Sequence, residues 1–262
     1  MTNAASISVF NFRRAKYIVF RFGFRAGFTR FIKKYYRKRL TIMITKYGLP
    51  QAALFPGASA ACMAALAALF YPAGWLLPAE LLLFIVLIWT LMFFRDPPRK
   101  AGADENVLFA PCDGTVTEIV SDDAETRISM FLSLFNVHIN RAPCSAKVVG
   151  VIYKKGQYRD ARDPASAKLN ESNDLAMTRL AIPEETIIVR QVSGAVARHI
   201  VCKAKSGDTL RQGERFGMIK FGSRTELIVP GAIHREICVK PGDKVKAGVT
   251  PLIRYTEPEG EV

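Results

Sequence analysis

The chain has 262 residues and a formal net charge of +14. Its first 49 residues hold 12 Lys and Arg and no Asp or Glu, whereas the rest of the chain holds 25 basic and 23 acidic residues. The positive charge therefore belongs to an N-terminal arm, which argues against a basic, nucleic-acid-binding body. The five cysteines form no Cys-x-x-Cys pair, which predicts reduced thiols rather than a disulfide framework or a metal site.

The basic arm, residues 1–49, has three interpretations. Aromatic and aliphatic residues interleave with Arg and Lys across residues 10–40, which is typical of a helix lying on an anionic membrane surface. The Arg-rich, acid-free start equally fits an organelle transit peptide. Translation could also begin at Met43, which would leave only a short tail. The sequence does not decide between these three.

Residues 50–96 predict an α-helical membrane hairpin. Residues 52–71 carry no charge and residues 75–94 carry only Glu80, so each run could cross a hydrocarbon core about 30 Å thick. The segment Pro72-Ala73-Gly74 separates the two runs, and basic residues flank only their outer ends. The positive-inside rule therefore places both ends in the cytoplasm. A re-entrant hairpin, suggested by the interruption at Pro56 and Gly57, and a pair of buried helices in a soluble domain are the alternatives.

Residues 97–262 predict a mainly β domain. Short β-branched and apolar runs alternate with turn residues, which indicates antiparallel strands. The expected strands cover residues 114–120, 128–134, 147–153, 186–192, 199–204, 215–221, 227–230 and 236–239. The polar residues 156–176 are predicted to form a long loop.

Two segments of this domain repeat the pattern Gly-Asp-x-apolar-x-x-Gly, at residues 207–213 and 242–248. Such a turn needs Gly at positive φ and an Asp that bonds its own backbone. The pattern is typical of lipoyl-like and barrel-sandwich hybrid folds, and residues 110–116 fit a strand entry in such a fold. A membrane hairpin joined to a lipoyl-like domain also suits a non-enzymatic membrane adaptor, which is the alternative function.

A Gly-Ser pair, Gly222-Ser223, lies late in this domain. A serine hydroxyl attacks its own preceding carbonyl with least hindrance after glycine, which has no Cβ and tolerates strained backbone angles. The attack turns the amide into an ester, and β-elimination can then break the chain. The pair alone equally fits a turn between strands.

Five segments together resemble the short, bacterial type of phosphatidylserine decarboxylase proenzyme. They lie at residues 93–97, 110–114, 135–143, 191–198 and 216–226, in this order behind the apolar hairpin. The resemblance implies that Ser223 attacks the carbonyl of Gly222 and that the chain is cut between them. Residue 223 then becomes a pyruvoyl group, a covalent cofactor whose keto group forms a Schiff base with the substrate amine.

The resemblance also implies the products, partners and location of the protein. The cut would leave a β chain of residues 1–222 and an α chain from residue 223, paired as a heterodimer, with a higher oligomer left open. The substrate would be phosphatidylserine in an anionic membrane, converted to phosphatidylethanolamine, with no nucleic acid involved. Together with the hairpin, this places the catalytic domain at the cytoplasmic face of the bacterial inner membrane.

His138 and Asp113 are the candidate catalytic residues beside Ser223. The resemblance assigns His138 as the base that takes the Ser223 proton and later as the acid that protonates the substrate carbon. Asp113 is predicted to orient the imidazole as in a serine triad, or to be an ordinary Asp-Gly turn residue. Longer family members carry a second histidine where this chain has Arg141. Arg141 and Lys154 are candidate phosphate-binding residues by charge only.

Overall fold

The computed structural model describes residues 7–12, 15–20, 44–70, 76–195, 199–220, 222–231 and 235–256. The chain forms two compact units, Met1–Pro98 and Arg99–Val262, whereas the sequence suggested a boundary after residue 96. Each unit is described below by itself.

The start of the basic arm contains strands, whereas one of its three interpretations was a surface helix. Strand β1, Ile7–Phe12, pairs antiparallel with β2, Ala15–Phe20, in a two-stranded sheet. The prediction of a surface helix across residues 10–40 is therefore wrong for its first part, and residues 21–43 lie outside the described ranges. The β-branched and aromatic residues of these two segments favour an extended backbone.

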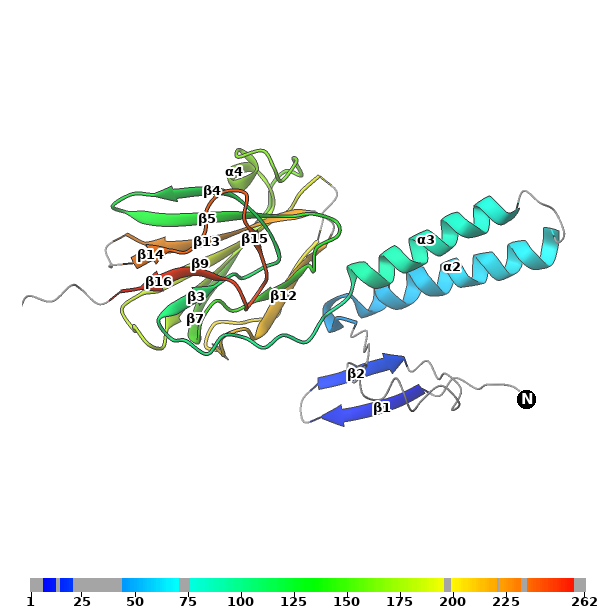
Figure 1. Cartoon of the computed structure of the whole chain (residues 1–262), viewed down its shortest axis with the longest axis horizontal. Coiled ribbons are helices and arrows are strands. Elements are labelled where there is room, and N and C mark those ends of the chain that lie inside the picture. Colours follow the sequence, from blue (N-terminus) through cyan, green and yellow to red (C-terminus); the bar gives the residue numbers. More distant parts are fainter. Residues whose placement is uncertain are drawn as a thin grey trace, which may run out of the picture. The chain divides into compact units, whose positions relative to one another are not determined.

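Two helices follow a short 3-10 turn, η1, Lys46–Gly48. Helix α2, Leu49–Phe70, packs against α3, Leu76–Phe93 (Figure 1). Helix α2 continues through Pro56, so the interruption expected there is not found. At the base of the pair, the Thr45 amide donates a hydrogen bond to the Phe94 carbonyl at 2.9 Å.

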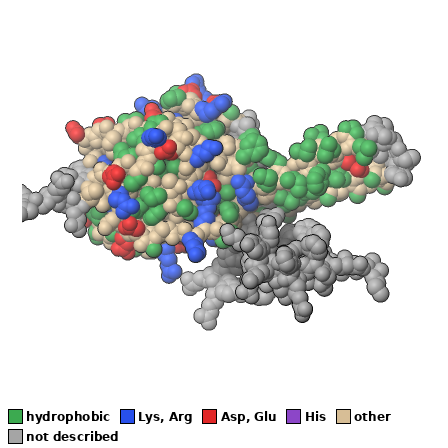
Figure 2. Space-filling model, in the orientation of Figure 1, with side chains coloured by type: hydrophobic (Ala, Val, Ile, Leu, Met, Phe, Trp, Pro, Cys, Tyr) green, Lys and Arg blue, Asp and Glu red, His purple; other side chains and the backbone are tan. Residues whose placement is uncertain are grey.

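Hydrophobic side chains cover much of the surface of the α2–α3 pair (Figure 2). The most exposed of these side chains are Leu54, Leu69, Leu77, Leu81 and Leu82. Among the described residues, however, no helix satisfies the length and apolarity expected of a membrane span. The two-helix structure is thus observed, while its insertion into a membrane stays a prediction.

The second unit is built almost entirely from strands, with one short helix, α4, Ser166–Leu169. Its strands are β3 Val107–Phe109, β4 Gly114–Ser121, β5 Glu125–Leu132, β6 Ile139–Arg141, β7 Ala146–Lys154, β8 Ser172–Arg179, β9 Thr186–Val192, β10 His199–Cys202, β11 Thr209–Leu210, β12 Arg215–Lys220, β13 Ser223–Pro230, β14 Arg235–Ile237, β15 Lys244–Val245 and β16 Pro251–Tyr255.

These strands form one large sheet and two small ones (Figure 1). The large sheet has the order β11-β7-β8-β9-β13-β5-β4-β15, and the small sheets have the orders β10-β12-β6 and β14-β16-β3. Every strand pairing described in this unit is antiparallel. The prediction of a mainly antiparallel β domain is confirmed, and each of the eight expected strands overlaps an observed one.

The long loop predicted at residues 156–176 is wrong at its C-terminal end, where β8 begins at Ser172. The polar side chains that suggested a loop have partners on β9. Asn173 donates to Gln191 at 3.1 Å, and Arg190 pairs with Asp174 at 2.7 Å. Because the neighbouring strand satisfies these polar groups, they are compatible with a sheet interior.

The two Gly-Asp repeats fold into equivalent turns. The first and last glycines of each repeat have positive φ, between 70° and 96°. Asp208 accepts a hydrogen bond from the Lys205 amide and Asp243 accepts one from the Lys240 amide, each at 2.9 Å. The predicted turn chemistry is confirmed.

Each repeat is also tied to one of two similar segments, residues 110–116 and 142–148, which share an Ala-Pro-Cys start. The Gly248 amide donates to the Ala110 carbonyl, and the Gly213 amide donates to the Ala142 carbonyl. The two segments cross-link through the bonds Phe109 N–H to Pro143 O and Arg141 N–H to Pro111 O, both 2.9 Å. The domain thus contains two related halves.

The core lies on one face of the large sheet. Fully buried members include Ile128, Met130, Leu175, Val189 and Leu227, which come from four neighbouring strands, β5, β8, β9 and β13. Strand β13 is buried along both faces, because residues 223–229 are all buried. This central strand begins at Ser223, so the core holds the candidate cleavage point in place.

Candidate active site

The Gly222–Ser223 junction lies at the entry to β13. Gly222 has φ of +71°, a conformation that glycine adopts without a steric penalty. Ser223 is fully buried and pairs with Leu132 of β5. Among the described residues, its hydroxyl has no hydrogen-bond partner. A buried hydroxyl without a partner is uncommon and costs free energy, which makes this serine a candidate for a chemical role.

His138 lies next to this junction and is fully buried just before β6. Its Nδ1 lies 3.0 Å from the Asn136 carbonyl oxygen, and its Nε2 lies 3.4 Å from the Gly222 amide nitrogen. A carbonyl can only accept, so Nδ1 carries the proton and Nε2 presents its lone pair to Gly222. This is the tautomer that a base acting at the junction requires.

The Asn136 carbonyl that orients the imidazole belongs to a rigid turn. The Asn136 side chain accepts hydrogen bonds from both the amide and the hydroxyl of Ser133, at 2.8 and 2.7 Å. The Asn136 amide donates back to the Ser133 carbonyl at 3.0 Å. The turn therefore holds the ring of His138 through its own backbone.

Gly194 lies against the carbonyl oxygen of Gly222. A Cβ on Gly194 would come closer to that oxygen than the 3.0 Å that real Cβ atoms respect. The segment that carries Gly194 is fixed from behind, because the Asn170 side chain donates to the carbonyls of Ser193 and Arg159, both at 2.9 Å. The Gly222 carbonyl oxygen thus occupies the space that a side chain at position 194 would need.

A buried chain of amides lies on the same face of β13 as Ser223. Thr225, two residues along, shares this face because side chains alternate along a strand. The Asn140 side chain approaches the Thr225 hydroxyl at 3.4 Å, and Gln191 donates to Asn140 at 2.9 Å. The Asn173 side chain in turn donates a hydrogen bond to Gln191 at 3.1 Å. All these side chains are buried, so the junction has a dry, polar wall.

Asp113 is not hydrogen-bonded to His138 in the described part of the chain. Its two carboxylate oxygens accept hydrogen bonds from the guanidinium of Arg99, at 2.5 and 2.6 Å. The carboxylate also accepts from the Ala247 amide at 2.9 Å, inside the second Gly-Asp turn. In the other half of the domain, the Ser145 hydroxyl accepts from the equivalent amide of Gln212 at 3.3 Å. This geometry matches the turn interpretation of Asp113.

The two candidate phosphate ligands lie in different surroundings. Arg141 is buried and donates to the Gly213 carbonyl at 3.1 Å, in the first Gly-Asp turn. Lys154 is exposed at the end of β7, opposite Ser172, and its Nζ donates to the Lys168 carbonyl at 3.3 Å. Their roles stay predictions, and only Lys154 is open to an incoming ligand.

Sequence reasoning missed three residues near the junction. Gly194 and Asn170 fix the surroundings of the Gly222 carbonyl, as described above. Lys220 ends β12 two residues before Gly222, is 5% exposed, and has its pKa lowered by burial. Gly194 and Lys220 carried a sequence signal, because both belong to the five segments on which the resemblance rests, whereas Asn170 lies outside them.

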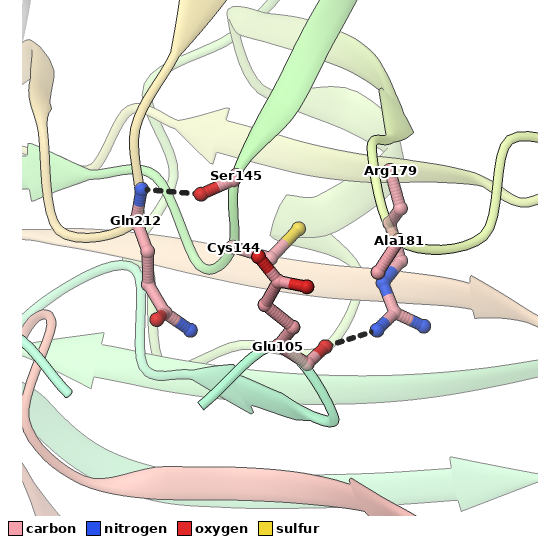
Figure 3. A pocket seen from close by; sticks show the side chains of 6 residues that line it. All are labelled: Glu105, Cys144, Ser145, Arg179, Ala181 and Gln212. Carbon is pink, nitrogen blue, oxygen red and sulfur yellow. Dashed lines mark hydrogen bonds between the residues drawn. The ribbon is translucent and has the colours of Figure 1, made fainter. Parts of the chain in front are cut away.

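A second polar cluster lies apart from Ser223 and His138. Glu105, Cys144, Ser145, Arg179, Ala181 and Gln212 line a cavity of about 10 Å³, enough for one water molecule (Figure 3). The fully buried Arg179 pairs with Glu185 at 2.7 Å and donates to the Glu105 carbonyl at 2.7 Å. Burial raises the pKa of Cys144 to about 12, so its thiol stays protonated and unreactive. We assign this cluster to stability.

Comparisons with known proteins point to one family. The family model described as phosphatidylserine decarboxylase matches residues 86–252. The chain is 41% identical over 201 residues to the phosphatidylserine decarboxylase proenzyme of Citrifermentans bemidjiense, covering 74% of this chain and 90% of that one. It is 38% identical over 195 residues to the proenzyme of the same name from Pelodictyon phaeoclathratiforme, covering 72% and 90%. It is 42% identical over 176 residues to the phosphatidylserine decarboxylase proenzyme of Ruegeria pomeroyi, covering 63% of this chain and 78% of that one.

Proposed function

The chain belongs to the phosphatidylserine decarboxylase family, and on this premise we propose that it cuts itself after Gly222 and converts Ser223 into a pyruvoyl group. Its reaction is the decarboxylation of phosphatidylserine to phosphatidylethanolamine, by an enzyme made as a proenzyme. One observation carries the assignment to these residues: the buried Ser223 hydroxyl has no hydrogen-bond partner in the part of the chain that the structure describes, and Ser223 follows a glycine at positive φ.

Self-cleavage begins when Ser223 Oγ bonds to the carbonyl carbon of Gly222 and the peptide C–N bond breaks. The products of this step are an ester and a free amine on residue 223. Loss of the Cα proton of residue 223 then expels the Gly222 carboxylate and leaves a dehydroalanine. Water replaces the nitrogen, which departs as ammonia, and a keto group remains. No external oxidant or reductant is needed.

His138 and Gly194 are the residues that we assign to this step. His138 presents an unprotonated Nε2 to the Gly222 amide, which suits a base that accepts the hydroxyl proton. The missing Cβ of Gly194 leaves room for the Gly222 carbonyl oxygen, on which negative charge develops during the attack. Asp113 stays a proposed orienting residue, although its hydrogen bonds in the uncleaved chain go to Arg99 and Ala247.

After cleavage, we propose that decarboxylation of the lipid takes place at residue 223, beside His138. The pyruvoyl group supplies the electron sink that decarboxylation needs and that standard side chains lack. The dry amide wall around Thr225 excludes water, and we assign to His138 the protonation of the substrate carbon. Because Ser223 and His138 are 0% exposed in the uncleaved chain, the segment ending at Gly222 must move before a headgroup can reach residue 223.

The two chains are proposed to remain together as a heterodimer. The small chain, residues 223–262, begins with β13, which pairs with β5 along eight residues and with β9 along five. It also supplies β15 and β16, which pair with β4 and β3 of the large chain. Removing the small chain would therefore expose the centre of the large sheet.

We further propose that the protein acts at the cytoplasmic face of a bacterial inner membrane. The substrate is a membrane lipid, and the exposed apolar side chains of α2 and α3 would lie in the bilayer interior or interface. A non-enzymatic adaptor with a lipoyl-like domain is the alternative. The two equivalent Gly-Asp turns support that fold, but they give no reason for the Ser223 environment.

An intact-mass measurement of the purified protein tests the proposal. Self-cleavage predicts two chains, residues 1–222 and residues 223–262, and decarboxylation of phosphatidylserine that hydroxylamine or borohydride abolishes by attacking the keto group. A single chain of 29.1 kDa without activity would support the adaptor. Activity that survives both reagents would contradict the pyruvoyl group.

A further inference from the structure

Large apolar side chains are exposed on elements that surround the candidate active site. They come from the turn between β5 and β6, from the end of β7 and from the loop at residues 155–171. We call them, together, the rim surface: Leu134, Phe135, Ile152, Tyr153, Tyr158 and Leu169. Phe135 is 68% exposed and Ile152 is 66% exposed, which is unusual for side chains of this size on a soluble domain.

Contacts near Gly222 and Gly194 place two of these three elements, the β5–β6 turn and the 155–171 loop, beside the junction. Leu134 Cδ2 lies 3.8 Å from the position that a Cβ on Gly222 would occupy. On the other side, Ala161 of the 155–171 loop lies 3.3 Å from the corresponding position on Gly194, which itself lies against Gly222. The exposed apolar side chains of these two elements therefore lie on segments that contact the buried junction.

Lysines lie among these apolar side chains. Lys154, Lys155 and Lys168 are exposed, and no salt bridge involves them in the described part of the chain. The two arginines of the same loop are different, because Arg162 pairs with Asp160 at 2.6 Å and Arg159 lies 4.0 Å from Asp163. The rim surface thus combines apolar side chains with an excess of positive charge.

From this combination we infer that the rim surface docks the catalytic domain directly onto an anionic lipid bilayer. Apolar side chains enter the interface between headgroups and acyl chains, tyrosines lie at headgroup level, and lysines bind anionic headgroups. The three exposed lysines favour an anionic bilayer over a second copy of this chain, because the copy carries a formal net charge of +14. The inference rests on the proposed function, since the substrate lies in such a membrane.

The test uses the full chain in detergent micelles in which the mole fraction of phosphatidylserine is varied. The variant Phe135→Ser/Ile152→Ser should raise the apparent KM, as a mole fraction, by about tenfold or more, because two apolar side chains are lost from the interface. Its kcat, and its turnover of a monomeric short-chain phosphatidylserine, should stay unchanged. The matched control is Leu180→Ser, because Leu180 is 53% exposed at the opposite end of β8.

A second pair of variants tests the charge. Lys155→Gln/Lys168→Gln should weaken co-sedimentation with vesicles that contain phosphatidylserine, by about fivefold for each lysine, and should not alter binding to neutral vesicles. The inference would be overturned if Phe135→Ser/Ile152→Ser and Leu180→Ser had the same apparent KM in micelles. It would also be overturned if Lys155→Gln/Lys168→Gln weakened binding to neutral vesicles as much as binding to vesicles that contain phosphatidylserine. A wild-type protein that decarboxylates neither the micellar nor the monomeric substrate would instead refute the proposed function, and vesicle binding would then decide the inference alone.

Discussion

The backbone of Gly194 lies so close to the carbonyl oxygen of Gly222 that no side chain fits between them. The two glycines are therefore needed for different reasons. Gly222 needs its positive φ, while the space around its Cβ position is open, with the nearest atom 3.8 Å away. Gly194 needs the absence of a Cβ, because the oxygen of the bond to be cut fills that space.

The first prediction follows for Gly194→Ala. The added methyl group must push the Gly222 carbonyl away from the Ser223 hydroxyl, so the protein should accumulate as an uncut chain of 29.1 kDa on a denaturing gel. Gly150→Ala is the matched control, because nothing lies within 4 Å of its Cβ position. The circular dichroism of Gly194→Ala should match that of the wild type. Cleavage of this variant at the normal rate would show that the carbonyl is free to move.

A second prediction concerns the imidazole beside Gly222. Replacing His138 by Gln removes the unprotonated Nε2 and should slow self-cleavage by roughly 10²–10⁴-fold, the usual contribution of a general base. The measurement is the rate at which the precursor is converted after synthesis. His199→Gln serves as the control, because His199 is an exposed residue at the start of β10. If both variants mature at the same rate as the wild type, His138 is not the base.

A third prediction separates the two interpretations of Asp113. If it orients the imidazole, Asp113→Asn should slow self-cleavage by roughly 10²–10⁴-fold, by analogy with a serine triad. If it only fixes the Gly-Asp turn through the Ala247 amide, the variant should cleave normally and lose stability instead. Ser145→Ala is the control, because Ser145 binds the equivalent turn in the other half of the domain. Because Asp113→Asn also removes the charge that pairs with Arg99, whereas Ser145→Ala removes one hydrogen bond of 3.3 Å, we expect the lower melting temperature for Asp113→Asn.

Much of the fold was predictable from the sequence because local signals and long-range packing agree. The Gly-Asp turns are examples, since positive φ at glycine and an Asp bonded to its own backbone are local requirements. The start of β8 was not predictable in this way. Asn173 and Asp174 favour loops in isolation, and they enter a strand only because Gln191 and Arg190 of β9 satisfy them.

The site was predictable only as a set of residue types. Ser223 and His138, which are 85 positions apart in the sequence, come together across two sheets, and their proximity depends on the register of β6, β12 and β13. The Arg99–Asp113 pair could not be foreseen, because nothing in the sequence marks Arg99 as a partner. The role of Gly194 depends on a backbone contact and leaves no pattern of its own.

A fourth prediction concerns the buried ion pair in the second polar cluster. Arg179 and Glu185 have side chains that are 0% and 1% exposed, and the Tyr255 hydroxyl donates to Glu185 at 2.8 Å. Glu185→Gln leaves a buried guanidinium without its counter-charge, so the free energy of unfolding should fall by about 3–5 kcal/mol. Urea unfolding measures this change. Asp104→Asn, which breaks the exposed pair with Arg254, should have little effect, and equal losses would contradict the prediction.

The last prediction concerns the retention of the small chain after self-cleavage. On the face of β13 opposite the core, Arg224 donates to Glu226 at 2.8 Å, to Ser129 of β5 at 2.8 Å and to Glu118 of β4 at 2.9 Å. Arg190 of β9 lies 3.6 Å from the other oxygen of Glu226. These contacts join the small chain to strands of the large chain on both sides of β13.

Arg224→Met should therefore weaken the association of the two chains, because it leaves the fully buried carboxylate of Glu226 poorly compensated. A loss of at least about 3 kcal/mol is expected. It would appear as release of residues 223–262 at a lower urea concentration in size-exclusion chromatography of the cleaved protein. Arg254→Met is the control in the same small chain, because the pair that Arg254 forms with Asp104 of the large chain, at 3.5 Å, is exposed. Release of the small chain from both variants at the same urea concentration would show that strand pairing alone holds it, without a contribution from the buried charges.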